Sequence, residues 1–208
     1  MLQLRKLVVG SWAVNCYLVV DGGTNQAVLV DPGEEAKKIL AWVKDVNIDR
    51  ILLTHGHFDH VGALEAVREA LGVSVGMHPA DQEYFNLKAD FDLEHGDMIP
   101  IGNGQLQVVF VPGHTPGSVA FILVEEGGFS QVIVGDAIFP GGPGKTEDHA
   151  ALRTSLESLQ REIFAWDDAV QLYPGHGDTT TVEVERPYFE AFIAKPLSPD
   201  VFGDVSWR

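Results

Sequence analysis

The chain is poor in cysteine, in basic residues and in long apolar runs. Cys16 is the one cysteine among 208 residues, so no disulfide can form within the chain and a thiolate-rich metal site is excluded. The 14 Lys and Arg face 30 Asp and Glu, and the formal net charge of -16 weighs against binding to a phosphate backbone. No apolar stretch approaches the roughly 18 residues that cross a bilayer, and no secretory segment follows Arg5 and Lys6. We therefore expect a cytoplasmic protein that acts on a small molecule and has no nucleic-acid or membrane partner.

Apolar residues are plentiful by comparison. They make up 45% of the chain and include 11 Phe and 4 Trp, enough to build a large core. Cys16 lies in an apolar stretch, which favours a buried, unreactive thiol. No linker or low-complexity segment interrupts the chain, so residues 1–208 are expected to form a single domain.

Predicted strands and helices alternate in two similar halves. The strands cover residues 13–20, 27–30, 50–54, 73–77, 105–111, 119–124, 131–134 and 169–173. The helices cover residues 34–44, 63–71, a stretch through 152–163, and 187–194, the last with Pro187 in its first turn. The tail, residues 196–208, is expected to pack back on the surface. This order predicts an α/β protein in which helices cover both outer faces of two packed sheets.

Three of the eight histidines and an aspartate stand within six positions, directly after a predicted buried strand: His55, His57, Asp59 and His60. Imidazole and carboxylate groups are ligands for zinc, iron and manganese. Residues two apart in an extended segment point to the same side, so His55 and His57 can bind one ion together. Asp59 and His60 lie beyond the turn and can reach a neighbouring position. Four ligands this close together would crowd one tetrahedral ion, which predicts two.

Three more polar residues follow apolar strands that end at a glycine or proline. They are His114 in Val111-Pro112-Gly113-His114, Asp136 in Val134-Gly135-Asp136, and His176 in Tyr173-Pro174-Gly175-His176. Strand ends at one edge of a sheet would bring these side chains to the same place. Asp136 is the natural bridging ligand, because a carboxylate has two oxygens that can span ions roughly 3.5–4 Å apart.

These motifs resemble those of the metallo-β-lactamase superfamily, and within it the glyoxalase II (hydroxyacylglutathione hydrolase) branch. The T-H-x-H-x-D-H motif of that branch stands at residues 54–60. The other matching segments are Pro112-Gly113-His114-Thr115-Pro116-Gly117-Ser118, Gly135-Asp136 with Ile138-Phe139, and Pro174-Gly175-His176-Gly177. The resemblance extends from about residue 15 to about residue 185. It implies an αββα four-layer sandwich of two mixed sheets flanked by helices.

The resemblance also implies the role of each residue. His55, His57 and His114 would bind a first metal ion, Asp59, His60 and His176 a second, and Asp136 would bridge them. Zinc is the expected metal, with iron and manganese as alternatives. Asp31 matches an aspartate that supports the histidine loop, although a plain turn aspartate is the other interpretation. The remaining histidines, His78, His95 and His149, are expected to be structural or exposed.

The implied activity is hydrolysis of thioesters of the hydroxyacylglutathione type. A water shared by two divalent ions has its pKa lowered from ~15.7 to near 7, and the resulting hydroxide would attack the acyl carbonyl. Asp59 would orient this nucleophile, which makes Asp59 and Asp136 the expected catalytic carboxylates. Lys145 matches a basic residue that binds glutathione, whereas Glu147 stands where the long enzymes have tyrosine and the short ones aspartate. Because 32 residues follow His176, we expect no separate C-terminal glutathione-binding helical domain like that of the long enzymes.

Other functions remain open at this stage. The main alternative is a mononuclear iron persulfide dioxygenase, which uses nearly the same ligands, followed by a metallo-hydrolase of another ester, lactone or amide. A di-iron oxygen or nitric-oxide reductase is disfavoured, because those relatives have a glutamate at the position of His57 and a fused flavin domain. The charge disfavours a nuclease, and the bridging aspartate disfavours a β-lactamase. A metal-binding interaction module without turnover is disfavoured by the complete ligand set.

Overall fold

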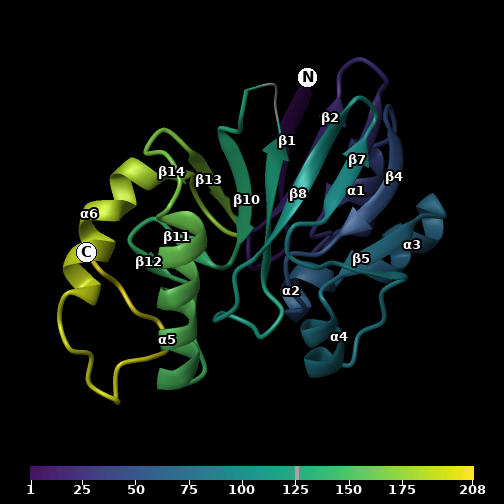
Figure 1. The fold of residues 1–208 in the computed structure, drawn as a ribbon. Helices are drawn as coiled ribbons and strands as arrows, with labels where there is room; N and C mark the ends of the chain where they lie inside the picture. The colour runs from purple at the N-terminus through teal and green to yellow at the C-terminus, as the bar shows by residue number, and fades with distance from the viewer. Residues whose placement is uncertain (125–126) are drawn as a thin grey trace.

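The computed structural model describes residues 1–124 and 127–208, and two six-stranded sheets form its centre (Figure 1). The first sheet has the order β1 (Leu2–Val9), β2 (Val14–Asp21), β3 (Gln26–Val30), β4 (Asn47–Leu52), β5 (Ser74–Met77) and β6 (Phe91–Asp92). The second has the order β14 (Thr180–Thr181), β13 (Gln171–Pro174), β10 (Gln131–Gly135), β9 (Val119–Val124), β8 (Gly104–Phe110) and β7 (Met98–Ile101). A small ribbon pairs β11 (Ile138–Phe139) with β12 (Gly142–Pro143).

Helices flank the two sheets on opposite sides (Figure 1). On the side of the first sheet are α1 (Ala36–Trp42), α2 (Phe58–Val61), α3 (Leu64–Leu71) and α4 (Pro79–Phe85). On the side of the second sheet are α5 (His149–Ser158) and α6 (Val182–Ile193). Helix α5 continues into a π-helical turn over Leu159–Ile163. Both sheets therefore have one face turned to helices and one face turned to each other.

Three apolar layers result from the two-residue period of the strands. In β2, Cys16 and Leu18 pack with α1 and α3, whereas Tyr17 and Val19 point into the layer between the sheets. In β9, residues 120 and 122 pack toward α5 and α6, whereas residues 121 and 123 point between the sheets. This confirms the predicted αββα sandwich, and Cys16 is buried as expected.

The strand ends that carry the predicted ligands meet at one edge. β3 and β4 run parallel, and so do β10 and β13. β8 and β10 are each antiparallel to β9, so they run in the same direction as each other. Hydrogen bonds join the two sheets at this edge: the Tyr17 hydroxyl donates to the Pro174 carbonyl at 2.7 Å, and the Val119 amide donates to the Thr54 carbonyl at 2.9 Å. The loops after β4, β8, β10 and β13 are thereby held against one another.

The predicted strands and the first three predicted helices are present in the structure, but α4 and β7, in the middle of the chain, were not predicted. Strand β1 was not predicted, although it pairs along its whole length with β2. The prediction that the last helix begins at Pro187 was wrong, since α6 begins at Val182 and Pro187 lies inside it. The Thr181 side chain accepts a hydrogen bond from the Val184 amide, and this N-cap starts the helix earlier than the proline suggests.

The tail contributes to the core as well as to the surface. Trp207 is buried against Phe164 and Phe189, and its indole N–H donates to the carboxylate of Glu185 at 3.0 Å. Glu185 is fully buried and also accepts hydrogen bonds from Thr180, the Gly141 amide and Arg208. The expectation that the tail only covers the surface was therefore wrong for Trp207.

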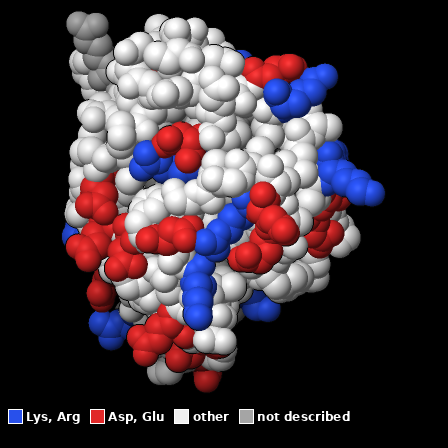
Figure 2. All heavy atoms as spheres, turned by 90° about the vertical axis from the view of Figure 1, so that its right-hand side faces the viewer, with Lys and Arg blue, Asp and Glu red and all other residues white. Residues whose placement is uncertain are grey.

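Acidic and basic side chains are interspersed on the face that Figure 2 turns toward the viewer. This is the side of the molecule that carries α3 and α4 in Figure 1. Among residues 1–124 and 127–208, no helix combines the length and the apolar character that a membrane crossing requires. The cytoplasmic location and the single-domain organisation of residues 1–208 stay predictions.

Replacing Trp207 by alanine should destabilise the fold by about 3–5 kcal/mol, the usual cost of truncating a buried aromatic side chain. The loss also removes one hydrogen bond from the buried Glu185 carboxylate. Urea denaturation followed by circular dichroism measures the change. Phe202→Ala is the matched control, because this tail side chain is 46% exposed and its removal should change stability little. Equal effects of the two substitutions would contradict the packing described for the tail.

Candidate metal centre

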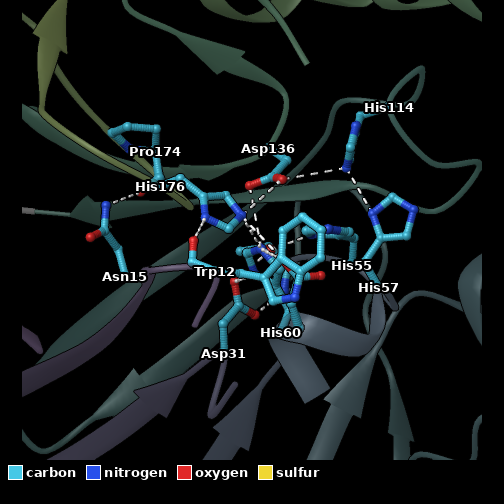
Figure 3. Close-up of polar contacts among 12 residues, drawn as sticks. Trp12, Asn15, Asp31, His55, His57, His60, His114, Asp136, Pro174 and His176 are labelled. Carbon is cyan, nitrogen blue, oxygen red and sulfur yellow. Dashed lines mark hydrogen bonds and ion pairs between the residues drawn. The ribbon is translucent and has the colours of Figure 1, made fainter. Parts of the chain in front are cut away.

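All seven predicted ligands lie together where the strand ends meet. Figure 3 labels His55, His57, His60, His114, Asp136 and His176. His55, His57, Asp59 and His60 come from the loop after β4 and from α2, which begins at Phe58. The other three follow β8, β10 and β13 and are His114, Asp136 and His176. The structure thus brings together every residue of the predicted ligand set. Their binding of metal stays a prediction.

The first group consists of His55, His57 and His114, whose nearest ring nitrogens lie within 4.8 Å of one another. The Nδ1 atom of His57 and the Nε2 atom of His114 are 2.9 Å apart. His55 is buried, whereas His57 and His114 are partly exposed. One side of this group is therefore accessible from outside.

The second group consists of Asp59, His60 and His176, with the same 4.8 Å limit between ligand atoms. The Nε2 atoms of His60 and His176 are 3.3 Å apart, and Oδ2 of Asp59 is 3.3 Å from Nε2 of His176. His60 is fully buried beneath the group. This arrangement agrees with the second ligand set that the sequence implied.

Asp136 lies between the two groups. Its Oδ2 atom is 3.5 Å from Nε2 of His114 and 3.5 Å from Nε2 of His176, and its Oδ1 atom is 3.4 Å from Nε2 of His60. Gly175 makes this position possible, because a Cβ atom there would come within 2.0 Å of the Asp136 carboxylate. The carboxylate thus has the position expected of a bridge.

The donor set fits divalent cations. Among the described residues, Nε2 of His55 and Oδ1 of Asp136 are buried polar atoms without a hydrogen-bond partner. Such atoms are costly unless something binds them, and both face the cluster of imidazoles. Imidazole nitrogens at 2.9 and 3.3 Å from one another repel unless a proton or a cation lies between their lone pairs. A cation would satisfy the orphaned atoms and relieve this repulsion.

The protonation states of the two groups differ. Burial, followed by the neighbouring His114, lowers the pKa of His57 to about 4. Burial lowers the pKa of His60 and of His176 as well, but the neighbouring carboxylate of Asp136 outweighs burial and raises both pKa values to about 10. The first group therefore offers neutral imidazoles, whereas the second must release protons before it binds a metal ion.

Four of the five histidines are oriented by a contact of Nδ1, on the side of the ring away from the cluster. His57 is the exception and turns its Nδ1 atom toward His114. Nδ1 of His60 is 3.0 Å from the carboxylate of Asp31, which also accepts hydrogen bonds from the Thr54 amide and hydroxyl. Backbone carbonyls orient two others: Lys145 O lies 2.8 Å from Nδ1 of His114, and Trp12 O lies 2.9 Å from Nδ1 of His176. Such contacts fix the ring orientation and the tautomer of metal ligands. Asp31 has the supporting position that the sequence indicated.

Asp81 was missed by the sequence reasoning. This carboxylate is fully buried and accepts hydrogen bonds from the amides of Gly56 and Gly117 and from the Thr115 hydroxyl. It therefore joins the loop that carries His55 and His57 to the loop that carries His114. Asp81 lies in the first turn of α4, where an aspartate is common, so the sequence contained no signal of this role.

The three remaining histidines are not among the residues of either ligand group. His78 caps α4 and stacks on Phe110, the amide of Phe110 donates to His95, and His149 contacts the Val201 carbonyl. This confirms their expected structural roles. Lys145 is exposed, and its backbone carbonyl rather than its side chain touches the cluster.

An αββα sandwich with five imidazoles and two carboxylates at one sheet edge defines a class of metal-dependent enzymes. The family model of the metallo-beta-lactamase superfamily matches residues 9–176. The chain belongs to this superfamily.

Relatives of similar length support this assignment. A probable metallo-hydrolase, YqgX of Bacillus subtilis, is 30% identical over 92% of this chain and 99% of its own. The hydroxyacylglutathione hydrolase GloC of Haemophilus influenzae is 28% identical over 89% of this chain and 95% of its own.

Two solved structures are also similar. The crystal structure of ETHE1 from Myxococcus xanthus has a TM-score of 0.77 at 30% identity and covers 88% of this chain and 81% of its own. The crystal structure of TTHA1623 in a di-iron-bound form has a TM-score of 0.72 at 34% identity. The match covers 88% of this chain and 96% of the TTHA1623 chain. Metallo-hydrolase chemistry and binding of divalent metals are therefore properties of the family to which this chain belongs.

Asp81→Asn should weaken metal binding about tenfold, the lower end of the usual effect for residues that support metal ligands. The amide retains the shape of the carboxylate but presents an N–H group to donors that need an acceptor, so the two loops lose part of their connection. Calorimetric titration with zinc measures the affinity. Asp45→Asn, an exposed substitution with the same charge change, is the control and should bind zinc like the unmodified protein. Unchanged affinity in Asp81→Asn would show that the connection does not position the ligands.

Zinc affinity should rise with pH between about pH 6 and 9, and proton release should accompany binding. The pKa values of His60 and His176, about 10, lie above this range, so protons compete with the metal and do so less as pH rises. Calorimetry in two buffers with different ionisation enthalpies measures the number of protons released. A binding enthalpy that is independent of the buffer would contradict this account.

Proposed function

We propose that this protein hydrolyses thioesters of the hydroxyacylglutathione type in a metal-dependent reaction. The observation that carries the proposal is the convergence of two groups of ligands on Asp136, with side chains of the first group accessible from outside. The proposal includes two divalent ions at this centre. His55, His57 and His114 would hold one, Asp59, His60 and His176 the other, and Asp136 would contact both.

Divalent ions at such a centre supply an activated water and polarise the carbonyl oxygen of an acyl substrate. The two ligand groups contain histidine and aspartate and no serine or cysteine. The proposed reaction requires no nucleophilic side chain. Water adds to the acyl carbon, the bond between that carbon and sulfur breaks, and a carboxylic acid and a thiol are released. The thiol sulfur takes up the proton that the water loses.

Asp59 is suited to orient the attacking water. Burial raises the pKa of its carboxyl group, but the hydrogen bond with His176 and the nearby His60 lower it below its ordinary value. Asp59 is thus ionised at neutral pH and can accept a hydrogen bond from water. Its side chain is 11% exposed, so its carboxylate borders the accessible part of the centre.

The name of one relative supports the thioester substrate, whereas the identity of the metal is a separate proposal. The relative from Haemophilus influenzae is named a hydroxyacylglutathione hydrolase, and the exposed Lys145 is available near the centre for a glutathione carboxylate. We propose zinc as the metal. Iron is the alternative, since the similar TTHA1623 structure is a di-iron form.

The purified, zinc-loaded protein should hydrolyse S-lactoylglutathione, and Asp136→Asn should lower kcat/KM by at least about 100-fold, because the substitution removes the carboxylate that both groups share. The release of free thiol measures the rate. Removal of metal by a chelator should abolish the activity, and reloading with zinc should restore it. Asp45→Asn is the control for the loss of one negative charge. The proposal fails if S-lactoylglutathione and simpler thioesters are not hydrolysed, or if hydrolysis survives metal removal.

An iron-dependent persulfide dioxygenase is the second candidate. The similar TTHA1623 structure, solved in a di-iron-bound form at 34% identity, favours iron as the metal, and nearly the same ligands would serve a single iron ion. This function predicts one iron ion per chain and oxygen uptake with glutathione persulfide. Thioester hydrolysis predicts no oxygen uptake. Metal analysis beside an oxygen electrode distinguishes the two.

A further inference from the structure

A cavity of about 340 Å³ opens beside the first ligand group. His57 and His114 are among its lining residues, so a substrate whose reacting bond reaches these ligands would place one of its two ends in this cavity. The wall is made by the loop after β8, the last turn of α4, the first turns of α5 and the segment that precedes α5. The lining residues outside the ligand set are Tyr84, Pro112, Gly113, Thr115, Pro116, Glu147, Ala151 and Thr154.

Glu147 is the one formally charged side chain among these lining residues, and no lysine or arginine is among them. The Tyr84 hydroxyl donates a hydrogen bond to Oε2 of Glu147 at 2.8 Å. This bond connects α4 with the segment before α5 across the cavity wall. It orients the carboxylate, and the hydrogen bond, together with the negative charge of Glu147, raises the pKa of the Tyr84 phenol.

The carboxylate lacks an opposite charge of its own. Within residues 1–124 and 127–208, no ion pair joins Glu147 to a lysine, an arginine or the N-terminus. Lys145 lies two residues earlier, is exposed and does not line the cavity. The second oxygen of Glu147 is therefore available to a group that enters the cavity.

A carboxylate beside an aromatic ring is a combination that binds ammonium groups. The carboxylate offers a charge-assisted hydrogen bond, and the face of a tyrosine ring attracts a cation. The same combination disfavours a carboxylate or a phosphate at this position, and the net charge of -16 adds to that effect. A substrate with an ammonium group at that end would therefore suit this cavity better than one with a carboxylate or a phosphate there.

We propose that Glu147, positioned by Tyr84, recognises an ammonium group on the thiol portion of the substrate. This inference rests on the proposed thioester hydrolysis and specifies its substrate class: acyl thioesters of thiols that carry a free amine several bonds from the sulfur. Glutathione belongs to this class, because its γ-glutamyl residue has a free α-amine. A thiol whose amine is acylated falls outside the class, although its size and its carboxylates are nearly the same.

Binding of two paired probes tests the inference separately from catalysis. S-methylglutathione carries the ammonium group and no free thiol, and N-acetyl-S-methylglutathione lacks the ammonium group. Calorimetry with the zinc-loaded protein should show that Glu147→Gln weakens binding of the first probe about five- to tenfold, and leaves the second unchanged. Glu69→Gln, an exposed substitution on α3, removes the same charge elsewhere and should leave both affinities unchanged.

Kinetics with S-lactoylglutathione and its N-acetyl derivative complete the test. Glu147→Gln should raise KM for the first substrate by a similar factor with little change in kcat, because the residue contacts the carrier and not the reacting bond. The inference is overturned if the unmodified protein binds neither probe, or if Glu147→Gln changes binding of both probes equally or of neither.

A failure of the proposed function would give other results than a failure of the ammonium site. In that case the loaded protein would hydrolyse no thioester, while Glu147→Gln would still weaken binding of the ammonium probe alone. Conversely, thioester hydrolysis with equal binding of the two probes in both proteins would support the proposed function and overturn the ammonium site.

Discussion

The packing of five imidazoles and two carboxylates against one another is the constraint on which the rest of this structure depends. Their ligand atoms lie within 4.8 Å in each group, and buried nitrogen and oxygen atoms among them have no hydrogen-bond partner within the described chain. Such a cluster is unfavourable without a cation, since desolvated polar groups and facing lone pairs both raise its free energy. The surrounding fold must therefore hold the side chains in place against their mutual repulsion.

Two buried carboxylates outside the ligand set provide much of that support. Asp31, at the end of β3, binds the Thr54 amide and hydroxyl and orients His60. Asp81, at the start of α4, binds the backbone of the loop after β4 and of the loop after β8. Each carboxylate accepts three hydrogen bonds, which offset the cost of its burial. The ligands are thus held by a shell of fixed acceptors, and their positions do not depend on side-chain packing alone.

The proposed chemistry and the proposed recognition of the substrate involve different parts of the molecule. The centre lies at the strand ends, where the rigid sheets fix its geometry. The adjoining cavity is bounded by α4, α5 and loops, and Glu147 and Tyr84 meet there from segments far apart in the chain. Members of one superfamily can therefore keep the centre and differ in the groups that contact the substrate.

The amino-acid sequence alone predicted the αββα fold and which side chains would meet at the strand ends. Both depend on local patterns: alternating apolar residues define the strands, and His55, His57, Asp59 and His60 follow a strand within six positions. The contacts of Asp81, the burial of Trp207 against Phe189 and the pairing of Tyr84 with Glu147 were decided by the tertiary structure. Each of these joins residues from distant segments, and no local pattern marks such a pair, because the chain must fold before the two side chains meet.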